Sequence, residues 1–107
     1  MVEIVYYRRY HRVTVKGHAG TAPAGEDLVC AAVSALCCTL AENVAQLHRL
    51  RKVTEPEIRL ENGDAEISCV PVDGYQSGIR IIFEAVCIGF ALLSGKYPGA
   101  VSYSIHR

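Results

Sequence analysis

The stretch Gly17–Ser34, which reads GHAGTAPAGEDLVCAAVS, decides the fold because it joins a strand to a helix. The residues before it alternate apolar and polar side chains, whereas apolar residues recur at helical spacing after Asp27. Between these segments, Ala19–Glu26 consists mainly of Gly, Ala and Pro, and we expect it to be a mobile surface loop. His18 and Cys30 flank this loop, so the strand end and the helix start together predict one candidate site.

Three glycines, Gly17, Gly20 and Gly25, bear on how this loop moves. Because glycine lacks a Cβ, it adopts the backbone torsions that a closing loop requires. We expect Ala19–Glu26 to be poorly ordered without substrate and to become ordered when substrate binds, which would complete the site.

Composition indicates one domain, residues 1–107, with enough apolar residues to bury a core. Half of the residues are hydrophobic and the formal net charge is zero, so neither a disordered chain nor a strongly polyanion-binding protein is expected. We therefore expect no direct nucleic-acid binding. We also expect no signal peptide and no membrane-spanning segment, because the apolar run Ile81–Leu93 is short and contains Glu84.

The five cysteines are an odd number and form no Cys-x-x-Cys pair. This pattern predicts free thiols in a reducing, cytoplasmic compartment, and it implies no metal or organic cofactor. Four of the cysteines lie inside apolar patterns, where core packing is their expected role: Cys37, Cys38, Cys69 and Cys87.

Hydropathy patterns predict an α+β fold with the element order ββαββαβ. Two helices would lie on one face of a mainly antiparallel sheet, in a single two-layer domain. The strongest turn signal is Asn62-Gly63, which separates two alternating segments, Glu57–Glu61 and Ala65–Cys69, and predicts a hairpin. The other expected elements are strands at Val2–Tyr7, His11–Lys16 and Ala100–His106, and helices at about Asp27–Leu47 and Tyr75–Gly95.

Cys30 would fall in the first turn of the first helix if Asp27 is its N-cap. The amide groups and the positive dipole end of a helix stabilise a thiolate there, and the same amides could receive an oxyanion. His18 could take the thiol proton, while Asp27 either caps the helix or orients His18. Ser34 lies one turn beyond Cys30 on the same face, within reach of the thiol.

Spacing alone leaves other interpretations open. A Cys at a helix start is more often a small buried residue than a nucleophile, and a lone His beside Gly is commonly a turn residue. A binding module without catalysis is one alternative, supported by the basic turn residues Arg8, Arg9 and Arg12. A redox-sensing thiol is another, although Cys37, two turns from Cys30, is poorly placed as a resolving partner.

The residues GHA at 17–19 and G-x-DLVCAAVS at 25–34 resemble the signature of the ribosomal-processing cysteine protease family, Prp. The likeness extends over the whole chain. It implies a Cys–His protease, usually a homodimer, that trims the N-terminal extension of a large-subunit ribosomal protein. It also implies Cys30 as nucleophile, His18 as base, and supporting roles for Asp27 and Ser34. With this resemblance, the alternative without catalysis is a ribosome-associated binding module. The loop departs from the family pattern at residues 21–24, which include a Pro and few polar side chains.

The second helix is hydrophobic nearly all round between Ile79 and Leu93. A helix in a two-layer domain buries only one stripe, so the surplus predicts an exposed apolar patch. A twofold interface that covers this patch predicts a homodimer, with Phe90 as a residue that could face the partner.

Overall fold

The structure is a computed structural model, and it describes residues 1–20 and 27–107. Five strands and two long helices follow one another in the order ββαββαβ, with a short 3₁₀ turn, η1 (Arg8–Tyr10), between the first two strands. The strands are β1 (Val2–Tyr7), β2 (Arg12–Gly17), β3 (Val53–Glu61), β4 (Asp64–Pro71) and β5 (Val101–His106), and the helices are α1 (Leu28–Arg49) and α2 (Gln76–Lys96).

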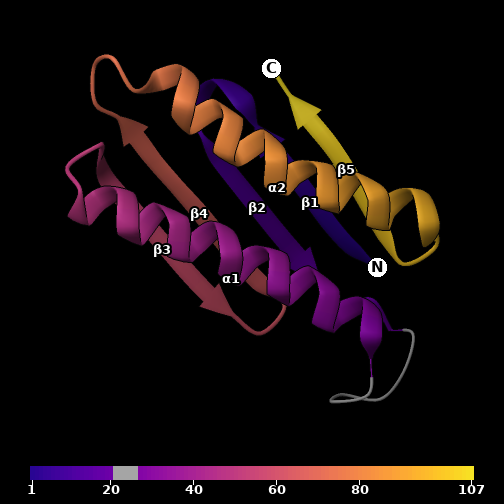
Figure 1. Cartoon of the computed structure of the whole chain (residues 1–107). Coiled ribbons are helices and arrows are strands. Elements are labelled where there is room, and N and C mark those ends of the chain that lie inside the picture. Colours follow the sequence, from indigo (N-terminus) through magenta and orange to yellow (C-terminus); the bar gives the residue numbers. More distant parts are fainter. Residues whose placement is uncertain (21–26) are drawn as a thin grey trace.

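The strands form one sheet in the order β3-β4-β2-β1-β5. Every neighbouring pair is antiparallel except β1 and β5, which run parallel. Both helices lie across the same face of this sheet (Figure 1). The predicted fold class, two helices on one face of a mainly antiparallel sheet, is therefore confirmed.

The main difference from the predicted boundaries is in β3, which begins at Val53 rather than near Glu57. The alternation that marks a strand is interrupted here, because the register with β4 shifts between Thr54 and Glu57 and Glu55 has φ +50°. Such an irregularity also accommodates Pro56, since β3 is an edge strand where a missing N–H is tolerated.

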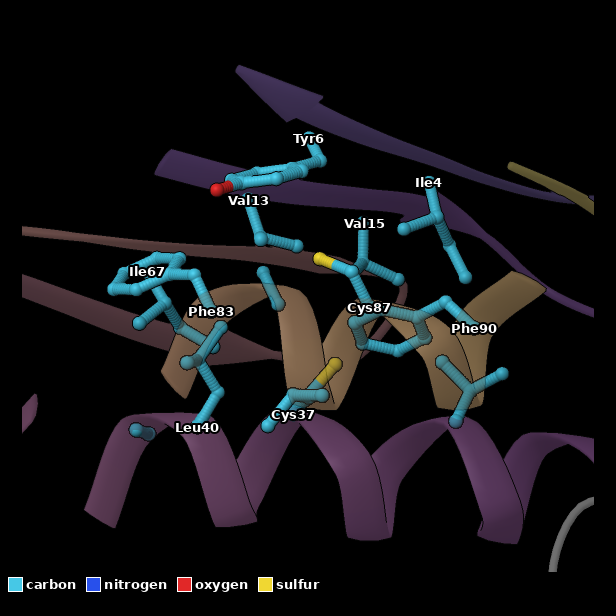
Figure 2. Packing of buried hydrophobic residues seen from close by; sticks show 14 of the residues in the cluster. Ile4, Tyr6, Val13, Val15, Cys37, Leu40, Ile67, Phe83, Cys87 and Phe90 are labelled. Atoms are coloured by element: carbon cyan, nitrogen blue, oxygen red, sulfur yellow. The ribbon is translucent and has the colours of Figure 1, made fainter. Parts of the chain in front are cut away.

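The core lies between the sheet and the two helices, and its side chains point from both layers toward one another (Figure 2). Tyr6, Phe83 and Phe90 are among its largest fully buried residues. Phe90 is 0% exposed, so it belongs to the core rather than to a surface that could face a partner. The two helices approach closely at Gly89, where a Cβ would lie 2.9 Å from the Leu36 methyl carbons.

Both helices are long and apolar enough, by length and composition alone, to cross a membrane. This differs from the expectation that no segment reaches that length, because the α1 and α2 patterns extend beyond the short run considered from the sequence. Each helix nevertheless packs on the sheet and contributes buried residues to the core, as the core helices of a two-layer domain do.

Candidate active site

The end of β2 is shaped by Gly17, which has φ +98°. A Cβ at this position would collide with the carbonyl oxygen of Met1, so only glycine fits beside the start of β1. The Gly17 N–H donates to the Gly63 carbonyl at 2.9 Å. These constraints turn the chain out of the sheet and place His18 next to the turn between β3 and β4.

The start of α1 is capped by Asp27, whose side chain is buried. Its Oδ1 accepts a hydrogen bond from the Cys30 amide at 3.0 Å, and its carbonyl accepts from the Ala31 amide at 3.0 Å. The capping interpretation of Asp27 is therefore confirmed. It also means that the Cys30 amide, one of the groups expected to receive an oxyanion, already has a partner.

The Cys30 thiol has a backbone donor that the sequence did not reveal. The Ala19 amide donates to the Cys30 Sγ at 3.4 Å, and Ala19 itself is buried. The residue after His18 therefore lies against the first turn of α1. Because the donor is a backbone amide, no residue type in the sequence indicates it, and only the tertiary structure shows this hydrogen bond. A donor directed at sulfur stabilises its negatively charged form.

One open cavity of about 300 Å³ connects these groups. It brings together three of the predicted site residues, His18, Cys30 and Ser34, and includes Gly17 at its wall. The remaining lining combines an apolar part with the β3–β4 turn: Val2, Val15, Val33, Cys37, Cys38, Leu60, Glu61, Asn62, Gly63, Asp64 and Ala65. Gly20 has φ +68°, whereas Gly25 and most of the Ala19–Glu26 loop lie outside the described residues.

The β3–β4 turn is a part of the site that sequence reasoning missed. The sequence predicts a hairpin at Asn62-Gly63, but the position of this turn beside His18 depends on the pairing of β2 with β4. The sequence predicts the turn, but only the order of strands in the sheet shows that the turn lies next to His18.

Cys30 differs from the buried cysteines in its exposure to solvent. Cys30 is partly exposed, whereas Cys37, Cys69 and Cys87 are buried. Burial raises the pKa of each of these three thiols to about 11, so they stay protonated near neutral pH. Core packing is thus the role of these three cysteines, as the sequence predicts. The same prediction is wrong for Cys38, whose side chain is exposed.

The site can support nucleophilic catalysis. A partly exposed thiol at a capped helix start and an exposed imidazole border the same cavity, which is the pairing that a thiol nucleophile and a general base require. Within residues 1–20 and 27–107, no three His, Cys, Asp or Glu side chains gather as metal ligands.

The family model described as cysteine protease Prp matches residues 1–102, and this chain belongs to that family. It is therefore a cysteine protease of the Prp family. Among curated protein sequences, none matches this chain.

Several solved structures share the fold. An essential ribosomal processing protease Prp from S. aureus, in complex with a covalently linked product peptide, matches with a TM-score of 0.71 at 22% identity, covering 97% of this chain and 96% of that one. The same protease with a substrate peptide matches with a TM-score of 0.65 at 21% identity, covering 97% and 96%. SMU.848 from Streptococcus mutans is 27% identical, with a TM-score of 0.66 and coverage of 98% and 91%.

Proposed function

We propose that this chain is an endopeptidase that removes the N-terminal extension of a large-subunit ribosomal protein during ribosome assembly in the cytoplasm. Cys30 is the nucleophile and His18 the general base. The observation that carries the proposal is the shared cavity, in which the Cys30 thiol, with the Ala19 amide at its sulfur, and the His18 imidazole line one open space.

In the proposed reaction, His18 removes the proton from the Cys30 Sγ and the thiolate attacks the carbonyl carbon of the scissile peptide bond. The tetrahedral intermediate then collapses, the C–N bond breaks, and His18 returns the proton to the leaving amine. Water, activated by the same imidazole, hydrolyses the resulting thioester and restores the thiol. Asp27 supports this chemistry by fixing the first turn of α1, and Ser34, one turn beyond Cys30, lines the same cavity.

The proposed substrate follows from family membership and from the shape of the site. The S. aureus relatives are described as ribosomal processing proteases and were solved with peptides. The cavity of this chain is open to solvent and partly apolar, which suits an extended peptide with an apolar side chain near the scissile bond.

Mass spectrometry of the host's candidate ribosomal protein, incubated with and without this enzyme, tests the proposal. We expect one N-terminal peptide to be released by the wild type. His18→Ala should lower the rate at least about a hundredfold. His11→Asn is the matched control, because His11 lies at the opposite end of β2 and outside the cavity. Unchanged processing by His18→Ala would rule out the proposed base, and no cleavage by the wild type would rule out the substrate.

We further propose a homodimer formed through the exposed face of α2. Ile81, Ile88 and Leu92 are 67%, 61% and 69% exposed, and their spacing of seven and four residues places them on one face. A second copy of the chain that meets this face about a twofold axis would cover it.

Light scattering at micromolar concentration tests the dimer. Ile88→Glu should reduce the mass to that of a monomer without unfolding the domain, because Ile88 is exposed. Leu50→Glu places the same charge on an exposed leucine outside α2 and should leave the mass unchanged. A monomeric wild type would contradict the proposal.

A further inference from the structure

The turn between β3 and β4 is tied directly to the chain that carries His18. Gly63, the second residue of the Asn62-Gly63 turn, accepts a hydrogen bond from the Gly17 amide at 2.9 Å. Since Gly17 precedes His18, this bond fixes the distance between the turn and the backbone of the proposed base. The two residues also line the same cavity.

The His18 imidazole packs against the backbone of this turn. A Cβ at Gly63 would lie 2.5 Å from Nε2, 2.9 Å from Cε1 and 3.3 Å from Cδ2 of the His18 ring. These three atoms form one edge of the imidazole, so the Nε2 edge of the ring faces Gly63. The space that any other side chain would occupy at position 63 is thus filled by the ring.

We propose that Gly63 is a positioning residue, and that the backbone of the β3–β4 turn is the wall that holds the His18 imidazole in its working orientation. This inference rests on the proposed function of His18 as the general base. A base must lie within hydrogen-bond reach of the proton it removes, so a displacement of about 1 Å reduces the rate sharply. In this proposal, Gly63 acts through His18.

Glycine is required at position 63 for two separable reasons. Gly63 has φ +74°, a conformation that other residues rarely adopt, and it also leaves room for the ring. Gly74 offers a matched control, because its φ is +93° but a Cβ there would meet nothing within 4 Å. Replacement by alanine strains the backbone at both positions, but it displaces His18 only at position 63.

The first experiment compares Gly63→Ala with Gly74→Ala in peptide cleavage. We expect kcat of Gly63→Ala to fall at least about tenfold below that of Gly74→Ala, with KM changed little, because orientation of the base is lost rather than substrate binding. Gly63→Asn sharpens the comparison, since asparagine tolerates positive φ. It should fold well and remain impaired. If Gly63→Asn cleaves at the wild-type rate, the contact with His18 is unimportant and the proposal is overturned.

The second experiment observes the imidazole without substrate. In NMR spectra, the His18 ring resonances, assigned with His18→Ala, should shift in Gly63→Ala but not in Gly74→Ala. The thermal midpoint provides a double-mutant test. Gly63→Ala should lower it more than Gly74→Ala in the wild-type background, and the excess should vanish when His18→Ala removes the ring. Equal effects in both backgrounds, with unchanged ring resonances, would contradict the proposed contact.

These measurements separate the two proposals. If His18→Ala cleaves normally, the assignment of His18 as base fails, whereas the NMR and thermal tests still report on the contact. If His18→Ala is impaired but Gly63→Ala matches Gly74→Ala in kcat, ring resonances and thermal midpoint, the base assignment stands and the positioning role of Gly63 fails.

Discussion

The two ends of β2 each bring a histidine next to a cysteine-bearing element, and their environments are opposite. At the end near η1, the His11 carbonyl accepts from the Cys69 amide at 3.2 Å, and the His11 ring packs edge-on against Phe83 at 6.0 Å between centroids. At the other end, His18 is exposed and the following amide donates to the Cys30 Sγ.

The His11–Cys69 pair and the His18–Cys30 pair differ in burial, and burial decides whether their side chains can react. Burial, with a smaller contribution from Arg80, lowers the pKa of His11, and burial raises the pKa of the Cys69 thiol to about 11. Both groups are therefore held neutral. Cys30 and His18 border an open cavity instead. Histidine and cysteine close together do not by themselves make a nucleophilic site, because the thiol also needs solvent access and a donor directed at its sulfur.

The largest expected effect comes from removing the thiol at each end of β2 in turn. Cys30→Ala should reduce peptide cleavage by at least about a thousandfold, because the proposed nucleophile is removed, while the thermal midpoint changes little. Cys69→Ala is the matched control: it should retain activity and lose about 1 kcal/mol of stability, since a buried side chain is truncated. Native-rate cleavage by Cys30→Ala would show that the nucleophile lies elsewhere.

Alkaline pH should destabilise the fold through its buried thiols. The folded pKa of Cys69, about 11, lies above its ordinary value of 9.0, so the unfolded chain releases its proton first as the pH rises. The stabilisation from the protonated thiol is complete below pH 9 and is lost between about pH 9 and 11. The loss in the free energy of unfolding reaches about 1 kcal/mol by pH 10.

Denaturant unfolding at pH 8 and pH 10 measures this loss, and Cys69→Ala should show a smaller difference between the two pH values than the wild type. Tyr6, whose pKa burial raises to about 12, contributes in the same direction at higher pH and is common to both proteins. Equal pH dependence in the two proteins would contradict the assignment to Cys69.

Two substitutions at Asp27 distinguish its role as the N-cap of α1 from a direct catalytic role beside Cys30. Asp27→Ala should cost about 1 kcal/mol of stability, because the Cys30 amide loses its acceptor, whereas Asp27→Asn should be nearly neutral since asparagine caps comparably well. Cleavage rates and thermal midpoints of the two variants measure this. A collapse of the rate in Asp27→Asn with unchanged stability would place Asp27 in the catalytic set.

The smallest expected effect is the acid sensitivity of His11. Because the folded pKa of His11 lies below its ordinary value of 6.5, the unfolded chain binds the proton first, and stability declines as the pH falls below about 6.5. His11→Asn removes this titration and keeps a residue that tolerates the observed φ of +47°. Thermal midpoints between pH 7.5 and pH 5 should therefore fall less steeply in His11→Asn than in the wild type, and identical slopes would contradict it.

The sequence by itself determined most of the fold and the two ends of the candidate site. Periodicity gave the helices and strands, because each buries one face, and Asp27 marked the start of α1 as an N-cap. It misjudged the start of β3, since a strand interrupted by a register shift has no regular alternation. It also suggested Phe90 as a surface residue, because a helix that is apolar nearly all round does not reveal which stripe faces the sheet.

Only the tertiary structure decided what surrounds His18 and Cys30. The Ala19 amide at the thiol and the Gly63 backbone at the imidazole are main-chain groups, which leave no side-chain pattern in the sequence. The position of the Gly63 backbone depends on the pairing of β2 with β4, which joins residues about fifty positions apart. Local propensities act over a few residues, whereas the order of strands in a sheet follows from how all the apolar faces are buried together.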